Sequence, residues 1–240
     1  MWKRHHQLNR MSLGQLIIAF VQYPAVWAYV GFGAVATALS WSCSSSAITT
    51  LLSIAAAMLV YPLVWYALHR WVLHGKWMFK SPLTAGTWKR IHYDHHMDPN
   101  DLRVLFGALF TTLPTIALST IPLGTAIGGF GAAMAALAAG LFITCVYEFI
   151  HCVEHLPYKP RNRVLARMKA LHLSHHFHDE KGNFGITNFW WDRFLGTLYQ
   201  RSERPAKSMT VFNLGYDDDS AHRYPWVKQL SHSSTTPKSD

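Results

Sequence analysis

Residues 92–96 read His-Tyr-Asp-His-His, and residues 172–176 read His-Leu-Ser-His-His. Both runs have the pattern HxxHH. On an α-helix, positions i, i+3 and i+4 lie on one face, so each run is predicted to turn its three imidazoles toward one point. A shared metal ion would require this arrangement. We therefore expect the chain to be organised around these two runs.

Two shorter histidine groups accompany the runs. HRWVLH contains His69 and His74, and HCVEH contains His151 and His155. A spacing of four places two rings on one face of a helical turn, whereas a spacing of five does not. We expect the helix to end between His69 and His74, or these two residues to bind different metals. Together the groups supply ten imidazoles, which exceed the four ligands of one zinc ion and suit two metals.

Two long stretches contain no Asp, Glu, Lys or Arg: Met11 to Leu68 and Val104 to Tyr147. Both are strongly apolar. Each has room for two membrane crossings, because one crossing takes about 20 residues. The sequence therefore predicts an all-α integral membrane protein with about four transmembrane helices. The expected crossings are Ser12 to about Leu39 with a kink at Pro24, about Ala47 to Leu68, Val104 to about Pro122, and about Ala126 to Ile150.

Basic residues flank these spans in the distribution of the positive-inside rule, so the multi-pass chain is predicted to begin in the cytoplasm. With four crossings, every histidine group then lies on the cytoplasmic side, in a histidine-rich dimetal cap. The cap is expected to contain an interfacial helix around Thr87 to Met97 and a basic helix around Asn162 to Lys169. Ser231 to Asp240 is polar and expected to be disordered.

The net charge of +9 does not indicate nucleic-acid binding, because no basic cluster is combined with a nucleic-acid-reading motif. Contacts with anionic lipid headgroups are a sufficient reason for the charge. The three cysteines form no CxxC pair, so neither a disulfide framework nor a thiolate metal site is predicted. Cys152 points off the face shared by His151 and His155, and we interpret it as a packing residue.

Imidazole ligands are compatible with iron, zinc, copper and nickel, so the ligand type does not name the metal. A histidine-only site beside acyl chains nevertheless suggests a lipid C–H bond as the target. Such a bond has no leaving group and no acidity. Oxygen activated on reduced iron can attack such a C–H bond. The metal then supplies the chemistry, and the protein holds the substrate in position.

The histidine motifs resemble those of the fatty acid hydroxylase superfamily, whose members are membrane di-iron enzymes that include sterol desaturases and fatty acid 2-hydroxylases. The resemblance runs in order through HRWVLH, HYDHH, YEFIHCVEH, HLSHHFHDEKGNFG and WWDRFLGT, from about His69 to Thr197. Within the superfamily the chain is most similar to the sphingolipid fatty acid 2-hydroxylases. They share the Tyr147 to His155 pattern and the stretch from Asn100 to Val104.

The resemblance implies a specific site. Tyr147 and Glu148 would contact the ligating rings, although family members often have Asp at the second position; the alternative for Glu148 is an interfacial carboxylate paired with a nearby Lys or Arg. His178 is expected to lie outside the ligand set. The implied ligands of two iron ions are His69, His74, His92, His95, His96, His151, His155, His172, His175 and His176.

The resemblance also implies partners. The enzyme would use O2 as co-substrate and a fatty acyl chain or membrane lipid as substrate, and zinc could substitute for iron without supporting the reaction. Relatives often carry a fused cytochrome b5-like domain, whereas only ten residues precede the first expected crossing. A separate ferredoxin or cytochrome donor is therefore expected. We expect a hydroxylase-like membrane domain over residues 1–203 and a polar, partly disordered tail over residues 204–240.

Two alternatives remain open at this point. The same ligand set would serve a sterol or acyl desaturase or a carotenoid hydroxylase, because these reactions differ in where the substrate carbon lies. A metal-binding or metal-transport membrane protein without catalytic activity is the other alternative. It predicts ionisable residues inside the crossings, and the two charge-free stretches contain none.

Overall fold

The computed structural model describes residues 6–43 and 46–233. Within these ranges the chain is helical, apart from an isolated backbone bridge between Gln7 and Asp101. This confirms the all-α prediction for the described residues. The elements in chain order are η1 (Leu8–Arg10), α1 (Leu13–Val21), α2 (Pro24–Cys43), α3 (Ala47–Ala67), η2 (Leu68–Leu73), η3 (Met78–Lys80), α4 (Pro82–Trp88), η4 (Lys89–Tyr93), α5 (Asp94–Met97), α6 (Leu102–Leu105), α7 (Leu109–His155), α8 (Arg163–Phe177), α9 (Trp190–Phe194), η5 (Arg201–Glu203), α10 (Asp218–Arg223) and α11 (Trp226–Ser233).

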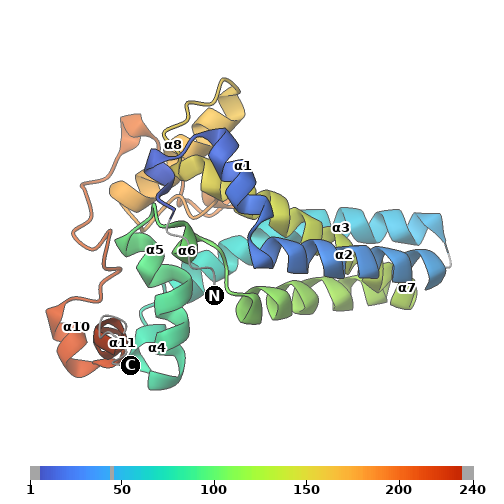
Figure 1. The fold of residues 1–240 in the computed structure, drawn as a ribbon, viewed down its shortest axis with the longest axis horizontal. Coiled ribbons are helices and arrows are strands. Elements are labelled where there is room, and N and C mark those ends of the chain that lie inside the picture. Colours follow the sequence, from blue (N-terminus) through green and yellow to red (C-terminus); the bar gives the residue numbers. More distant parts are fainter. Residues whose placement is uncertain (1–5, 44–45, 234–240) are drawn as a thin grey trace.

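Three helical stretches are long and apolar enough to cross a membrane: Pro24–Cys43, Ala47–Leu73 and Leu102–His155. They contain α2, α3 and α7, which extend together from one end of the molecule (Figure 1). Side chains on their outer surfaces are apolar and exposed; Leu59 and Leu118 are each 76% exposed. Such a surface is suited to contact with lipid rather than water.

The third stretch folds back on itself within α7. The bend lies at Gly128 and Gly129, where the backbone leaves the helical region. Gly129 has a φ of +72° and a ψ of −154°, which residues with a side chain adopt only with strain. Pro122, the expected end of the outgoing segment, lies inside α7 instead. The two expected crossings, Val104 to about Pro122 and about Ala126 to Ile150, are therefore two antiparallel arms of one helix that bends at Gly128 and Gly129.

Small residues let the two arms of α7 approach closely. A Cβ atom added at Gly124 would lie 2.5 Å from the Ala132 carbonyl oxygen and 2.6 Å from Ala133 Cα. A Cβ atom at Gly140 would lie 2.9 Å from the side chain of Ile116. These glycines therefore serve packing, as expected for close helix contacts in apolar surroundings.

The first apolar segment forms two helices rather than one kinked crossing. α1 is capped by Ser12, whose side chain accepts the N–H of Gln15. It ends at Val21, and α2 starts at Pro24, where a proline removes no helical hydrogen bond. Through Phe20, α1 packs against α6 and the end of α7. The prediction of a crossing from Ser12 is thus wrong, because the long apolar helix starts at Pro24.

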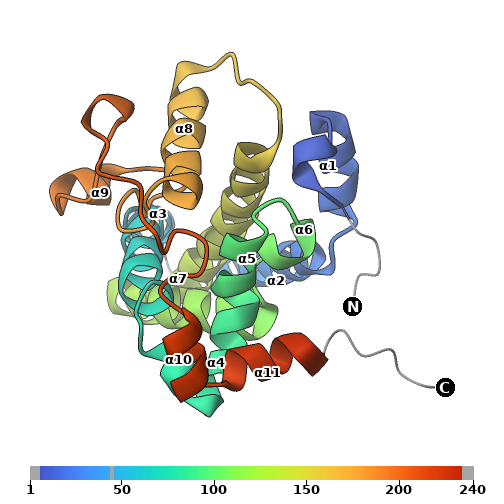
Figure 2. The ribbon, with the colours of Figure 1, turned by 90° about the vertical axis from the view of Figure 1, so that its left-hand side faces the viewer.

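A polar cap occupies the other end of the molecule (Figures 1 and 2). α4, η4 and α5 follow one another without a break from Pro82 to Met97 and include the expected helix around Thr87 to Met97. α8 includes the expected basic helix, and the Asn162 side chain caps it by accepting the N–H groups of Val164 and Leu165. Each of these two helical segments carries one HxxHH run.

The segment after residue 203 is partly helical and packs on the cap. Leu214, Tyr216 and Val227 form a buried cluster with Phe79 and Trp88, which holds α11 against α4. Residues 231–233 belong to α11, so the prediction of disorder from Ser231 is wrong for these three residues. Residues 234–240 lie outside the described residues. The domain division at residue 203 remains a prediction.

Candidate metal centre

Nine of the ten predicted ligands come together in two groups, and all of them except the half-buried His74 are buried. Within each group, the candidate ligand atoms lie within 4.8 Å of one another. We name the groups site A and site B. Site A consists of His95, His151, His155, His172 and His176, and site B consists of His69, His74, His92 and His96.

Each HxxHH run is divided between the two sites. His92 and His96 belong to site B, whereas His95 belongs to site A. In the second run, His172 and His176 belong to site A, whereas His175 lies beside site B. The expectation that all three rings of a run face one ion is wrong, because positions i+3 and i+4 differ by about 100° around the helix axis.

His175, the tenth predicted ligand, lies beside site B. Its ring centroid is 4.8 Å from those of His69 and His74 and 5.0 Å from that of His96. Its Nε2 atom is buried and has no hydrogen-bond partner among the described residues. Each site therefore has five imidazoles within or beside it.

A π-helical turn explains the spacing of five between His69 and His74. In η2 the His74 N–H donates to the His69 carbonyl oxygen at 3.0 Å, which is an i→i+5 hydrogen bond. Such a turn brings residues five apart to the same side. The two Nε2 atoms are 3.2 Å apart. The helix ends at Leu73, between the two histidines, as one expectation had it. The other expectation, that they bind different metals, is wrong, because His69 and His74 share site B.

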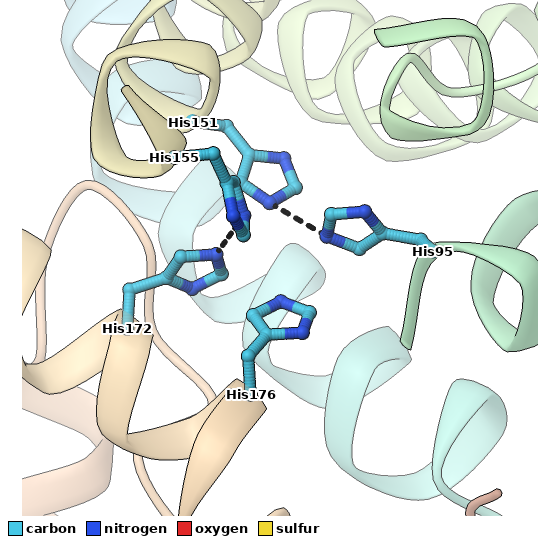
Figure 3. Close-up of side chains that lie close together, drawn as sticks. All are labelled: His95, His151, His155, His172 and His176. Carbon is cyan, nitrogen blue, oxygen red and sulfur yellow. Dashed lines mark hydrogen bonds between the residues drawn. The ribbon is translucent and has the colours of Figure 1, made fainter. Parts of the chain in front are cut away.

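The separations of the ring nitrogens fit metal ligation. Two nitrogens bound to one ion at about 2.1 Å are about 3.0–3.4 Å apart when the bonds enclose about 90–110°. In site A, the Nε2 atoms of His95 and His151 are 3.2 Å apart, and those of His155 and His172 are 3.0 Å apart. Figure 3 shows these rings, carried by α5, α7 and α8, pointing toward one another. The residues present therefore fit a metal ion.

Burial keeps these imidazoles neutral. It lowers the pKa of His96 to about 3 and the pKa of His175 to about 3. The pKa of His172 and the pKa of His176 are also well below the ordinary value, first through burial and then through neighbouring imidazoles. Neutral imidazole is the form that binds a metal ion.

Backbone carbonyls orient three rings at site B. The Nδ1 atom of His69 donates to the carbonyl oxygen of Phe184 at 2.6 Å, and His96 Nδ1 donates to that of Val211 at 3.0 Å. His175 Nδ1 donates to the carbonyl oxygen of Gly182 at 2.8 Å. A carbonyl can only accept, so each Nδ1 carries the proton and each Nε2 is left with a free lone pair for a metal.

The loop that supplies the Phe184 carbonyl is fixed by Asp192. This buried carboxylate accepts the N–H groups of Phe184 at 2.7 Å and Gly185 at 2.8 Å, and the hydroxyl of Thr197 at 2.8 Å. Asp192 lies in the motif WWDRFLGT, which entered the sequence analysis only as part of the family resemblance. Its role in holding the loop beside His69 was not anticipated from the sequence.

A cavity of about 70 Å³ lies between the two sites. Six histidines from both sites border it, together with apolar side chains and the polar groups of Thr112, Tyr147 and Glu148. The apolar part of the wall consists of Trp65, Leu73, Ile91, Leu105 and Ile186. The cavity thus combines two clusters of metal-binding nitrogens with a largely apolar wall.

Residues 54–197 match the family model described as fatty acid hydroxylase. The chain belongs to the fatty acid hydroxylase family. The chain is 29% identical over 157 residues to the ceramide very long chain fatty acid hydroxylase SCS7 of Saccharomyces cerevisiae, an alignment that covers 62% of this chain and 38% of the yeast protein. It is 30% identical over 176 residues to the dihydroceramide fatty acyl 2-hydroxylase FAH1 of Arabidopsis thaliana, with 73% of this chain and 71% of the plant protein covered.

A solved structure shares the fold. It is described as full-length scs7p with only the hydroxylase domain visible, and the superposition has a TM-score of 0.60 at 23% sequence identity. The match covers 84% of this chain and 71% of that chain. In the sequence alignments, this chain spans less than half the length of the yeast relative and about seven tenths of the plant relative.

Tyr147 and Glu148 both border the cavity. Tyr147 stacks on Trp65 at 5.7 Å and lies 6.3 Å from the ring of His151, both between ring centroids. Glu148 is buried, and its Oε1 atom accepts the backbone N–H of Gly107 at 3.1 Å. Among the described residues, no hydrogen bond joins Glu148 to an imidazole and no salt bridge joins it to a cation. Its role at the site remains a prediction.

A different carboxylate lies behind the candidate ligands of site A. Glu154 is fully buried, and its Oε2 atom lies 3.9 Å from His172 Nδ1. Glu154 directly precedes His155 in HCVEH, and this proximity to a predicted ligand could have indicated its role from the sequence. By contrast, His178 lies outside both sites, where its Nε2 donates to the Pro205 carbonyl oxygen.

Proposed function

We propose that this chain is a membrane lipid hydroxylase that inserts one oxygen atom of O2 into the acyl chain of a fatty acid or membrane lipid. The observation that carries the proposal is the cavity between sites A and B, which joins two imidazole clusters to a largely apolar wall. A reaction at an unactivated C–H bond needs both features at one place. The family match supports the reaction class.

Two iron ions are proposed as the resident metals, with the nine histidines of sites A and B and His175 as ligands. When bound, the ions would supply the activation of O2 that an unactivated C–H bond requires. Zinc suits the same imidazoles and would not support this redox chemistry. The stoichiometry is one acyl C–H bond, one O2, two electrons and two protons giving one hydroxyl group and one water molecule.

The chain's own residues position the substrate. Trp65, Leu73 and Ile186 offer an apolar surface to an acyl chain and exclude water from the cavity. Tyr147 stacks on Trp65, so its ring fixes one wall beside His151. The hydrogen bond from Gly107 to Glu148 fixes the opposite, polar part of the wall. These contacts would hold one carbon of the chain between the two sites.

The named relatives suggest the substrate class. They are described as ceramide very long chain fatty acid and dihydroceramide fatty acyl 2-hydroxylases. We propose that this chain also acts on a long acyl chain, at the carbon next to its carbonyl group. The exposed apolar surfaces of α2, α3 and α7 would let such a substrate approach from within the bilayer.

The proposed topology has four crossings. α2, α3 and the two arms of α7 would span the membrane, with the polar cap and both sites on the cytoplasmic side. The basic residues of the cap support this orientation through the positive-inside rule. A separate electron donor of the ferredoxin or cytochrome type would then reach the cap from the cytoplasm.

Lipid mass spectrometry of expressing cells, coupled to metal analysis of the purified protein, tests the proposal. We expect two irons per chain and acyl chains heavier by one oxygen atom, with the hydroxyl located at the carbon next to the carbonyl. Both the oxygen and the activity should vanish in the His151→Ala variant. Acyl chains or sterols that lose two hydrogens without gaining oxygen would instead establish a desaturase, and oxidised carotenoids would establish a carotenoid hydroxylase.

A further inference from the structure

The outer face of α8 is strongly basic. Between residues 159 and 207, nine Lys and Arg side chains are exposed, and Glu203 is the only exposed acid. Three of these cations, Arg167, Arg201 and Arg204, line one hollow of about 610 Å³ together with Ser174, Phe177 and His178. We call this hollow and its three arginines the α8 basic surface.

The cations of this surface are available for an external partner. Among the described residues, no carboxylate lies within salt-bridge distance of Arg167, Arg201 or Arg204. Asp179 and Glu180, the acids closest in sequence to the end of α8, are buried. Unpaired exposed cations around a hollow create a positive potential that attracts an acidic partner.

The position of the surface argues against lipid headgroups as the occupant. Figure 1 shows α8 and the orange segment that follows it at the end of the molecule opposite to the tips of α2, α3 and α7. The proposed membrane-spanning arms therefore point away from it. The hollow lies on the cap and not on the proposed membrane-spanning arms, so a soluble protein can approach it directly.

The same surface lies directly over the ligands. Ser174, which accepts a hydrogen bond from Arg204 Nη2 at 3.3 Å, stands between His172 and His175 on α8. The inner face of α8 thus carries candidate ligands of both sites, whereas its outer face carries Arg167 and lies beside Arg204. A partner bound here would be separated from the sites by about the 10 Å thickness of one helix.

We propose that the α8 basic surface is the docking site of a small acidic one-electron carrier protein. This inference rests on the proposed function, which consumes two electrons for each hydroxyl group formed. Two reduced carriers would dock in turn. Each would be oxidised by one electron, and the two electrons would reduce a pair of ferric ions at sites A and B to ferrous ions before O2 is consumed.

Binding measurements test the surface without relying on turnover. The iron-loaded protein in lipid nanodiscs would be titrated with an acidic [2Fe–2S] ferredoxin and, separately, with the soluble haem domain of cytochrome b5. The test variant is R201E/R204E, and the control is K80E/K228E, which makes the same charge change at two exposed lysines on the other side of the cap. Metal content and circular dichroism establish that both variants are folded.

We expect R201E/R204E to weaken binding of at least one carrier about tenfold or more at low salt, and K80E/K228E to change it less than about twofold. Added salt should weaken the wild type more than R201E/R204E. Equal affinity in the wild type and both variants, or no binding of either carrier to the wild type, would overturn the proposal. So would a selective loss of binding to vesicles containing phosphatidylglycerol, which would identify the surface as a lipid contact.

A single-turnover experiment separates the docking site from the reaction itself. Protein reduced with dithionite in the absence of O2 and then mixed with O2 receives its two electrons without a carrier. We expect the wild type and R201E/R204E to form equal amounts of hydroxylated lipid under these conditions, while the carrier-driven reaction of the variant is slower about tenfold. Product in neither protein would refute the proposed function, whereas equal carrier-driven rates would refute only the docking site.

Discussion

Glu154 Oε2 lies 3.9 Å from His172 Nδ1, and the two side chains are 0% and 1% exposed. Neither oxygen of Glu154 nor Nδ1 of His172 has a hydrogen-bond partner among the described residues. A buried carboxylate without a partner is costly, so closing this gap would stabilise the protein and would orient His172 toward site A. Site B uses backbone carbonyls for the same purpose. The two sites therefore hold their rings by different means.

The first prediction concerns this carboxylate. Glu154→Leu should weaken metal binding at site A by about 10–100-fold and leave site B loaded, because only His172 loses the carboxylate that lies beside its Nδ1 atom. Glu154→Gln keeps an acceptor oxygen and should restore part of the affinity. Metal retained during dialysis against increasing chelator would measure this, with Glu203→Leu as the exposed control. Simultaneous loss of both metals would contradict an effect confined to site A.

Adjacent histidines should control different metals. His95 belongs to site A and His96 to site B. We expect His95→Ala and His96→Ala each to lower the metal content from two ions per chain to about one, and the double variant to approach zero. Elemental analysis of purified protein measures this, with His178→Ala as the control. The division of the HxxHH run would be wrong if either single variant lost both ions.

The metal-free protein should lose stability in acid. The pKa of His96 and the pKa of His175 are lowered from 6.5 to about 3 by burial, so between these pH values the folded chain binds fewer protons than the unfolded chain. Their contribution is complete above pH 6.5 and is lost as the pH falls toward 3. A change from about pH 7.5 to about pH 5.5 should cost about 1.4 kcal/mol for each of them.

Thermal unfolding of chelator-treated protein in detergent would measure how the free energy of unfolding changes with pH, which we call the pH slope. His96→Gln should reduce the pH dependence, because the substituted side chain no longer titrates. The exposed His222 provides the matched control. A His222→Gln variant with the same loss of slope would refute the assignment to the buried rings.

The bend of α7 gives a prediction about packing. Gly124→Ala should destabilise the protein by about 1–3 kcal/mol, since the new Cβ atom would meet the backbone of the returning arm. Gly31 in α2 is the matched control, because a Cβ atom there meets nothing within 4 Å. Gly31→Ala should be neutral or slightly stabilising in the same detergent unfolding assay. Equal effects of the two substitutions would show that the arms can separate without cost.

Much of the site could be predicted from the sequence. The ten histidines stand in short-spaced groups beside charge-free stretches, and those two patterns suffice to predict helices, membrane segments and a shared metal-binding region. The helical segments around Thr87 to Met97 and from Asn162 onward were likewise expected, the first as an interfacial helix and the second as a basic helix.

The division of ligands between sites could not be predicted in this way. Spacing along a regular helix says which rings share a face, but η2 is a π-helical turn, and its i→i+5 bond brings His69 and His74 together. The same limitation applies to His95 and His96, which are neighbours in sequence yet face different sites. Which site a ring joins depends on the helices that surround it.

The sequence by itself therefore determined the helical membrane class, the identity of the histidines and the family resemblance, because each depends on local composition and spacing. The tertiary structure alone decided the pairing of rings into sites A and B, the cavity between them and the partners of Glu148, Glu154 and Asp192. These features join residues that are far apart along the chain, and their contacts follow from how α5, α7 and α8 pack rather than from any local pattern.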